Sequence, residues 1–431
     1  MKILLLGATG LIGSSILAKL LSTGHSVIAV SRGRASVRRQ FPQAQWAPLD
    51  LRTIDAAEQW TQHLEGVDAV INCAGVLGQS GSDSTDAAHV RGPSTLYAAC
   101  EQAGVKRVIH FSAVGVDRQT PSEFSRSKAE GDAALKAMAL DWVILRPSVV
   151  VGRRAYGGSA LFRGLAAMPI LPRFKNAGEL QIVQLDDVVA TALFFLSTSA
   201  PARVELELVG PDRLTFNEAV ATYRRWLGWR PARLVNVSDR LIDVMYRLGD
   251  FVAWLGWRTP VREIAKKEMA HGGVGDPTAW TSLTGIRPQS LDAALTAEPA
   301  DVREKWFARI YALKPLIFAV TALLWISTAL VSFGPGWKIG LDLLYEGGMS
   351  GPIAPLTVIA GASTDLIIGV AIAFRRTSKV ALVAALIVSV VYLIVGTILM
   401  PRLWMEPLGP MLKIWPAMAL NLVALAIVED R

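Results

Sequence analysis

Cysteine is nearly absent from this sequence: Cys73 and Cys100 are the only two among 431 residues. Two cysteines cannot form a disulfide framework or a multi-cysteine metal site, so we predict a protein without a metal centre. The sequence also lacks a basic run with interleaved aromatic residues, which argues against nucleic-acid binding despite a net charge of +8. No signal peptide precedes the first predicted strand, so we expect the N-terminal part to stay in the cytoplasm.

Apolar residues, by contrast, are in excess and unevenly distributed. Hydrophobic residues make up 52% of the chain, and the mean hydropathy of +0.37 is high for a soluble protein. The excess gathers after residue 314, which indicates a membrane part. Because 431 residues predict more than one unit, we expect a soluble domain over residues 1–300 and a membrane domain over residues 301–431. The pI near 9.6 suits a protein that lies on an anionic membrane face.

Residues 2–13 (KILLLGATGLIG) combine an apolar strand, a glycine-rich turn and the start of an amphipathic helix. Gly7 permits a tight turn, Gly10 lets the backbone approach a pyrophosphate, and Gly13 lets helix and strand pack closely. The amides that open the helix would face the phosphates, where the helix dipole favours negative charge. The dinucleotide contacts predicted here are Gly7, Thr9, Gly10, Leu11, Ile12 and Gly13. The alternative is an ordinary turn, which glycine also marks.

The second predicted strand covers residues 26–31, and the residues at its end bear on the choice of dinucleotide. A site that prefers NAD usually places Asp or Glu here to bond the ribose 2′-hydroxyl. This chain has Ser31, Arg32 and Arg34, and a guanidinium binds the 2′-phosphate that a carboxylate would repel. We therefore favour NADP(H) over NAD(H); the alternative is that these arginines belong to a solvated loop. Asp50 and Leu51, after the third predicted strand, are expected at the adenine.

Two further apolar runs end in small or polar residues. Residues 67–73 fit a strand buried on both faces of a parallel sheet, and they lead into Cys73, Ala74 and Gly75, where the backbone must pass close to the cofactor. Residues 107–111 form the next predicted strand, which is followed by Ser112 and contains His110 as an expected core residue. Because such strands alternate with helical patterns, we predict an α/β Rossmann domain with a doubly wound parallel sheet.

The order of the glycine loop, Asn-x-Ala-Gly, a strand-end Ser, a helical Lys and Leu-Arg-Pro-Ser resembles the extended or atypical short-chain dehydrogenase/reductases over roughly residues 1–230. The branch that it resembles includes NmrA-like proteins and the nucleotide-binding accessory subunit of respiratory complex I. The resemblance implies that Ser112 and Lys128 belong to a Ser–Tyr–Lys reactive group. It also implies a substrate lobe over about residues 150–300, with Pro147 and Ser148 beside the nicotinamide.

The tyrosine of that group is replaced, because Phe124 stands at the first position of the Tyr-x-x-x-Lys pattern. In the family the tyrosine supplies the proton for carbonyl reduction, and its acidity is raised by the lysine cation. Phenylalanine has no proton to donate, whereas Lys128 can still hold the nicotinamide ribose and Ser112 can still hydrogen-bond a substrate. We therefore expect cofactor binding, while the substitution puts ordinary alcohol–ketone chemistry in question.

Four apolar segments follow, each about long enough to cross a hydrocarbon core of ~30 Å. They cover residues 316–333, 353–374, 380–400 and 411–428. Lys and Arg gather before the first segment and between the second and third, which by the positive-inside rule places both termini and the nucleotide domain in the cytoplasm. We expect an all-α, four-helix, multi-pass domain in the inner (cytoplasmic) membrane. The tract that runs from residues 306–311 through residues 403–410 resembles the DoxX-like four-helix membrane family, which includes parts of quinone-linked oxidoreductases.

Two features of the second half leave alternatives open. Asp365 lies within a predicted span, where a carboxyl group is costly and is a functional candidate by default. Alternatively, it is protonated and bonded to Ser363, Thr364 or a neighbouring helix. Residues 233–257 interleave apolar and charged side chains as an amphipathic helix does, and this helix could lie on the bilayer surface or pack on the Rossmann lobe.

Three functions fit these patterns. The first is a membrane-anchored NAD(P)H-dependent oxidoreductase acting on a small lipophilic acceptor such as a quinone or an isoprenoid, because a tether at the bilayer concentrates a membrane-dissolved substrate. The second is a catalytically silent NADP(H)-binding redox sensor or assembly factor, which Phe124 permits. The third, an NAD(P)-dependent epimerase or dehydratase acting on a lipid-linked sugar, usually needs the missing tyrosine. Fold alone does not choose among them, and the sequence leaves the oligomeric state open.

Overall fold

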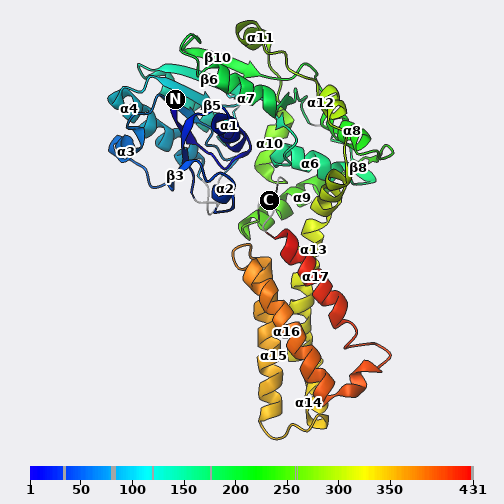
Figure 1. The fold of residues 1–431 in the computed structure, drawn as a ribbon. Coiled ribbons are helices and arrows are strands. Elements are labelled where there is room, and N and C mark those ends of the chain that lie inside the picture. The colour runs from blue at the N-terminus through cyan, green and yellow to red at the C-terminus, as the bar shows by residue number, and fades with distance from the viewer. Residues whose placement is uncertain are drawn as a thin grey trace. The chain divides into compact units, whose positions relative to one another are not determined.

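A computed structural model describes residues 1–32, 35–78, 84–118, 121–174, 177–257, 259 and 261–428 (Figure 1). The chain divides into two compact units, each described here by itself. The first contains Met1–Asp250 and Pro260–Ala308, and the second contains Phe251–Thr259 and Arg309–Arg431.

The first unit is built on a parallel sheet. Within the described residues its seven strands lie in the order β10-β6-β5-β4-β1-β2-β3. Their bounds are β1 Lys2–Leu6, β2 Ser26–Val30, β3 Gln45–Ala47, β4 Ala69–Asn72, β5 Arg107–Phe111, β6 Asp141–Pro147 and β10 Val204–Leu208. The strand order reverses at β1, whose neighbours are β2 on one side and β4 on the other, and crevices for ligands form at such a switch point. The predicted doubly wound Rossmann sheet is confirmed.

Helices and short strands complete this unit. The helices are α1 Leu11–Ser22, α2 Ala35–Gln40, α3 Thr61–Leu64, α4 Gly92–Ala103, α5 Glu123–Lys136, α6 Gly157–Ala166, α7 Leu185–Phe194, α8 Phe216–Trp226, α9 Asp239–Trp254, α10 Glu263–His271, α11 Thr278–Thr284 and α12 Leu291–Ala297. A 3₁₀ turn, η1 Ala57–Trp60, and a π-helical turn, η2 Ala87–Arg91, precede α3 and α4. Strand β7 Val150–Val151 pairs with β9 Val183–Gln184, and β8 Ile170–Pro172 pairs with β11 Arg233–Val235.

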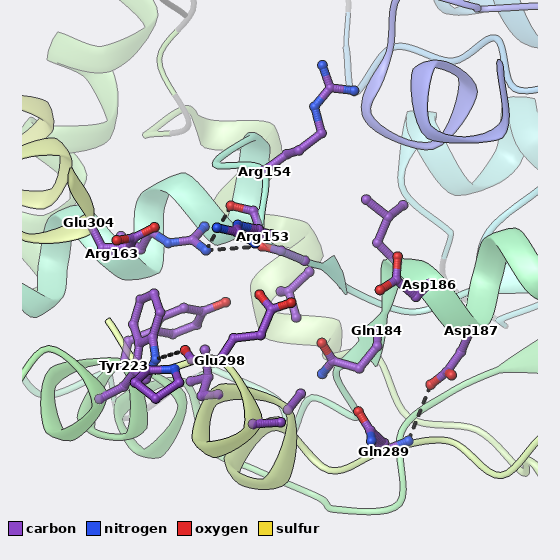
Figure 2. A pocket seen from close by; sticks show the side chains of 18 of the residues that line it. Arg153, Arg154, Arg163, Gln184, Asp186, Asp187, Tyr223, Gln289, Glu298 and Glu304 are labelled. Carbon is purple, nitrogen blue, oxygen red and sulfur yellow. Dashed lines mark hydrogen bonds between the residues drawn. The ribbon is translucent and has the colours of Figure 1, made fainter. Parts of the chain in front are cut away.

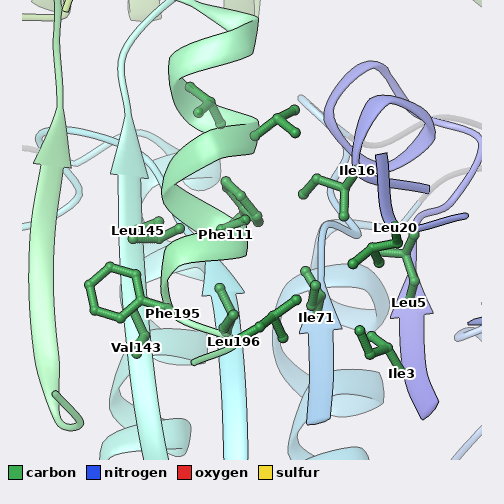
Figure 3. Packing of buried hydrophobic residues seen from close by; sticks show 14 of the residues in the cluster. Ile3, Leu5, Ile16, Leu20, Ile71, Phe111, Val143, Leu145, Phe195 and Leu196 are labelled. Atoms are coloured by element: carbon green, nitrogen blue, oxygen red, sulfur yellow. The ribbon is translucent and has the colours of Figure 1, made fainter. Parts of the chain in front are cut away.

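The sheet is buried on both faces because successive strand residues point to opposite sides. Ile3 and Leu5 of β1 belong to one buried cluster, and Leu4 and Leu6 belong to the other. Figure 3 shows the first cluster, in which helix α1 packs on the strands of the sheet. The near-continuous apolar runs of the sequence are therefore explained by helices covering both faces.

The second unit is helical. Its elements are α13 Val302–Phe333, whose first turns belong to the first unit, α14 Trp337–Glu346, α15 Ile353–Ala373, α16 Ser378–Leu399, the 3₁₀ turn η3 Pro401–Trp404 and α17 Ile414–Ile427. Among the described residues, three helices are long and apolar enough to cross a membrane, namely α13, α15 and α16. They correspond to the first three predicted spans, although α13 begins earlier and continues through Pro315.

The predicted fourth span, residues 411–428, was too long. Helix α17 has 14 residues, and at 1.5 Å per residue it covers only about 21 Å of a ~30 Å hydrocarbon core. The physical reason is the chain reversal before it, where Gly409 adopts φ +56° and Lys413 is the N-cap. Helix α17 nevertheless runs back along α16, because Met411 lies against Gly396, and Ala424 shares a buried cluster with Ala385.

Candidate functional site

The glycine-rich turn joins β1 to α1 at the switch point of the sheet. Gly7 has φ +70°, and a Cβ added to it would lie 2.6 Å from the carbonyl oxygen of Cys73 on the neighbouring strand. A Cβ on Gly13 would overlap the carbonyl oxygen of Gly7. Gly10, the N-cap of α1, has ordinary extended backbone (φ −76°, ψ 177°), and a Cβ there would meet only that same oxygen, at 3.3 Å.

The open side of this turn has the properties of a diphosphate site. The amides of Leu11, Ile12 and Gly13 have no acceptor within the helix because they lie in its first turn. In addition, the guanidinium of Arg154 donates to the Ser14 hydroxyl at 2.6 Å, which brings a cation to the first turns of α1. Free amides, a helix dipole and a nearby guanidinium all favour an anion, so the residues present fit the pyrophosphate of a dinucleotide.

The end of β4 and helix α5 bring three predicted residues together. The Lys128 ammonium donates to the carbonyl oxygen of Phe111 at 2.8 Å and to that of Ala74 at 3.4 Å. A Cβ on Gly75 would lie 3.3 Å from the same nitrogen, so this edge of the sheet has room for backbone only. An ammonium has three N–H donors, and the described hydrogen bonds use two of them. Burial lowers the pKa of Lys128 to about 8, although the negative charge of Asp132 opposes this shift.

The residues predicted at the adenosine end lie after β2 and β3. The amide of Ser31 donates to the carbonyl oxygen of Ala47, which sets the end of β2 beside β3. The Asp50 carboxylate accepts hydrogen bonds from the Arg52 side chain, the shortest at 2.6 Å. These bonds hold the pKa of Asp50 below its usual value, and the charge of Arg32 contributes in the same direction.

The other two residues predicted at this end are Leu51 and Arg34. Leu51 packs against the start of α4, because a Cβ on Gly92 would lie 2.9 Å from the Cβ of Leu51. Arg34 lies outside the described residues.

Ser112 is tied into a buried polar network that the sequence did not reveal. Its hydroxyl donates to the Asp132 carboxylate at 2.9 Å, and Arg146 donates to the same oxygen at 3.0 Å. The second carboxylate oxygen lies 3.4 Å from Nε2 of His110, which is 1% exposed and thus confirmed as a core histidine. Burial raises the pKa of Asp132, but His110, Ser112 and Arg146 together bring it below its usual value. Because the Ser112 hydroxyl donates its hydrogen bond to Asp132, only its oxygen lone pairs remain to accept a hydrogen bond from a ligand.

Phe124 packs edge-on against His89, with ring centroids 5.6 Å apart. The His89 ring is held by the Val76 amide, which donates to Nε2 at 3.1 Å, and by the Ser127 hydroxyl, 2.8 Å from Nδ1. Burial, together with the Lys128 cation, lowers the pKa of His89 to about 2, so this imidazole is neutral. No spacing rule identifies His89, because the π-helical turn η2 sets its position, and such turns are frequent at functional sites.

Strand β6 ends at Pro147, and the hydrogen bonds of the next residue, Ser148, join two further segments of the chain. Its hydroxyl donates to the carbonyl oxygen of Gly273 at 2.8 Å, and its amide donates to that of Leu208. The carbonyl oxygen of Pro147 accepts from the amide of Val114. Ser148 thus fastens the segment after α10 to the end of the sheet.

A cavity of about 470 Å³ lies in the same unit, between α1, α7, α8 and α12 (Figure 2). Its polar wall includes Arg153, Arg154, Gln184 and Glu298. No local sequence pattern predicts this cavity, because its lining residues come from segments far apart in the chain. Arg154 both lines it and donates to Ser14, so the cavity is adjacent to the dinucleotide turn.

In the second unit, Asp365 of α15 is 3% exposed. The Tyr392 hydroxyl of α16 donates to its carboxyl group at 2.8 Å. Thr364 donates instead to the carbonyl oxygen of Ala360, so of the partners considered from the sequence it is a neighbouring helix that supplies the hydrogen bond.

The fold and these sites define a dinucleotide-binding α/β unit joined to a helical membrane unit. Residues 7–162 match the NAD(P)H-binding family, and residues 322–422 match the DoxX-like family. The chain thus combines an N-terminal segment that matches the NAD(P)H-binding family with a C-terminal segment that matches the DoxX-like family, in the order that the two sequence resemblances implied.

Several known proteins are similar to part of this chain. An uncharacterized protein of Mycobacterium tuberculosis is 26% identical over 226 residues, which are 52% of this chain but only 23% of that protein. Ceramide reductase of Caulobacter vibrioides is 24% identical over 237 residues, 54% of this chain and 72% of that enzyme. The 40 kDa subunit of mitochondrial NADH-ubiquinone oxidoreductase of Neurospora crassa is 24% identical over 291 residues, 66% of this chain and 75% of the subunit.

Among solved structures, UDP-glucuronic acid 4-epimerase from Bacillus cereus, in complex with UDP-glucuronic acid and NAD, matches with a TM-score of 0.53 and 18% identity. The match covers 72% of this chain and all of the epimerase (100%). At this identity the likeness shows the shared fold alone.

Proposed function

We propose that this chain is a membrane-anchored NAD(P)H-dependent oxidoreductase that acts on a lipophilic acceptor such as a quinone or an isoprenoid. The proposal rests on one observation: at the edge of the sheet expected to bind the cofactor, the lysine of the Ser–Tyr–Lys pattern is present but the tyrosine that donates the proton is replaced. Lys128 lies between the carbonyl groups of Ala74 and Phe111, while Phe124 occupies the position of the acid. The DoxX-like domain on the same chain favours a substrate dissolved in the bilayer.

The proposal assigns the cofactor contacts to the residues predicted from the sequence. When bound, the nicotinamide supplies a hydride to the acceptor. The turn at Gly10 and the guanidinium of Arg154 would hold the pyrophosphate, and the remaining donor of Lys128 would hold the nicotinamide ribose. We favour NADP(H) because Arg32 follows β2, at the place where an NAD-preferring site has a carboxylate.

The missing proton donor favours a quinone over a ketone. Reducing a ketone requires a proton for the developing alkoxide. Phenylalanine cannot supply this proton, and the Ser112 hydroxyl already donates its hydrogen bond to Asp132. A quinone can take its proton from water or another acid after hydride transfer. Two relatives carry names that agree with lipophilic chemistry, since one is a ceramide reductase and the other a subunit of an NADH-ubiquinone oxidoreductase.

The same observations also support a second candidate, a catalytically silent NADP(H)-binding sensor or assembly factor. A silent binder needs residues that hold the cofactor but no side chain that donates a proton. The hydrogen bond from Ser112 to Asp132 is compatible with a purely structural role for Ser112. Only turnover separates it from the oxidoreductase.

For the location we propose the inner (cytoplasmic) membrane, with the nucleotide-binding unit in the cytoplasm. Lys305, Arg309 and Lys314 lie in the N-terminal half of α13, Arg376 lies between α15 and α16, and Lys379 lies in the first turn of α16. The positive-inside rule therefore assigns the N-terminal end of α13 and the link between α15 and α16 to the cytoplasmic side of the membrane.

The test is steady-state NADPH consumption by the full-length protein in nanodiscs, with a panel of quinones and with a soluble ketone. We expect turnover with a quinone and none with the ketone. Phe124→Tyr should create ketone reduction, because the new hydroxyl has the Lys128 cation nearby, and should leave quinone turnover nearly unchanged. Lys128→Ala should lower quinone turnover through lost cofactor positioning.

Lys136→Ala is the matched control, since Lys136 lies on the same helix and pairs with Glu205 instead of approaching the cofactor edge. It should behave as wild type. If NADPH binds but wild-type consumption equals the acceptor-free rate with every quinone, the oxidoreductase proposal fails and the silent binder remains.

A further inference from the structure

Helix α9, Asp239–Trp254, exposes its apolar side chains to the surroundings. On a helix with 3.6 residues per turn they fall on one face. They are Leu241 (53% exposed), Val244 (49%), Met245 (47%), Leu248 (57%) and Phe251 (56%). An amphipathic helix usually packs on a domain by burying its apolar face, whereas α9 leaves its apolar face exposed.

The opposite face of α9 is the one that packs on protein. Tyr246 is 9% exposed and its hydroxyl contacts the Met269 sulfur of α10. A Cβ on Gly249 would overlap the carbonyl oxygen of Val261, so the backbones approach closely there. Helix α9 therefore packs on the first unit through the face of Tyr246 and Gly249, while its apolar face is exposed among the described residues.

The charges of α9 are sorted in the same manner. Asp243 pairs with Lys266 of α10, and Asp250 pairs at 3.2 Å with Arg262, the residue before α10, so two of the acidic groups are neutralised. Arg240 and Arg247 are both exposed, and the helical repeat places them along one edge of the apolar face. An apolar face edged by arginines is the pattern of a helix that lies in a membrane interface.

The end of α9 is part of the membrane unit, which contains Phe251–Thr259. The indole nitrogen of Trp257 donates to the carbonyl oxygen of Ala373, the last residue of α15, at 2.7 Å. The amide of Arg375 donates to the carbonyl oxygen of Leu255 at 3.0 Å. Because a spanning helix ends at the lipid–water boundary, these bonds hold the end of α9 at that boundary.

We propose that α9 is an interfacial helix that docks on the leaflet at this end of α15. Its apolar face enters the acyl boundary, and Arg240 and Arg247 bind the phosphate groups of anionic phospholipids. Trp254, 71% exposed on the last turn, lies at headgroup level, where tryptophan is enriched. The partner is thus a lipid surface, and the proposal is independent of the catalytic activity.

The test places a fluorescent label on each face of the full-length protein in vesicles. Val244→Cys carries an environment-sensitive dye on the apolar face, and Lys19→Cys carries it on the exposed side of α1 as the matched control. In phosphatidylcholine vesicles that contain phosphatidylglycerol, the label at position 244 should shift to the blue and be quenched by acyl-chain nitroxides. The label at position 19 should show neither change.

Two further variants separate lipid docking from other causes. Arg240→Gln and Arg247→Gln should each lower the ratio of docked to undocked helix about five-fold in phosphatidylglycerol vesicles, and much less in pure phosphatidylcholine. Leu248→Glu should return the emission at position 244 to that of water while NADPH still binds.

A water-like emission at position 244 in both kinds of vesicle would overturn the proposal. So would efficient cross-linking between two copies through position 244 with no nitroxide quenching, since the face would then be covered by a second chain.

Discussion

Replacing Gly10 with alanine should weaken dinucleotide binding without unfolding the protein. The backbone of Gly10 is extended, a conformation that alanine adopts readily, and the added methyl group would have one close neighbour, the carbonyl oxygen of Gly7 at 3.3 Å. We expect Gly10→Ala to change the free energy of unfolding by less than about 1 kcal/mol.

The same methyl group would stand on the open side of the turn, where the pyrophosphate must approach the amides of α1. Losing one charge-assisted hydrogen bond costs about 1.5–3 kcal/mol, so the Kd for NADPH should rise roughly 10- to 150-fold. Gly10→Asp adds a negative charge at the same place and should abolish binding.

Gly13→Ala provides the contrast, because its Cβ would overlap the carbonyl oxygen of Gly7 and force α1 away from β1. Overpacking of this kind costs about 1–3 kcal/mol, which should lower the Tm by several degrees. The assays are calorimetric titration with NADPH and thermal unfolding of the detergent-solubilised protein without cofactor. If Gly10→Ala lowers the Tm as much as Gly13→Ala does, or leaves NADPH affinity unchanged, the assignment of the open side is refuted.

Three other outcomes follow from the geometry. Arg32→Ala should weaken NADPH binding by about 1–3 kcal/mol and hardly affect NADH, whereas equal losses in titrations of both would remove the case for 2′-phosphate recognition. The pKa of Lys128 is lowered from 10.5 to about 8, so between these pH values the unfolded chain holds a proton that the folded chain has lost, and stability should rise with pH by up to about 3 kcal/mol. Unfolding experiments at pH 7 and pH 10 should show that Lys128→Met abolishes this rise, and an identical rise in the variant would contradict it. For topology, a thiol-reactive, membrane-impermeant reagent should label Leu408→Cys from outside intact cells and Thr377→Cys only after permeabilisation; the reverse pattern would overturn the orientation.

Much of the fold follows from local patterns in the sequence. Apolar runs that end in glycine or a small polar residue predicted the strands of the sheet, and β5 has the predicted bounds. The glycine spacing at Gly7, Gly10 and Gly13 predicted the turn, because φ +70° at Gly7 and the close contact at Gly13 leave no room for a side chain. The membrane character of α13, α15 and α16 follows from length and hydropathy alone. These features depend on neighbours in sequence, whose spacing the chain states directly.

Other features depend on which segments meet, and only the tertiary structure decided those. Asp132 accepts a hydrogen bond from Ser112, 20 residues away in the sequence, and Arg154 donates to Ser14, 140 residues away. The sequence left the hydrogen-bond partner of Asp365 undecided, and the structure identifies it as Tyr392 of α16. Periodicity identified the apolar face of α9, but not its direction, because a period specifies which side chains share a face and carries no information about what lies across from it. Lys266 of α10 and Arg262 before it pair with the acidic residues of the polar face, and these contacts leave the apolar face exposed.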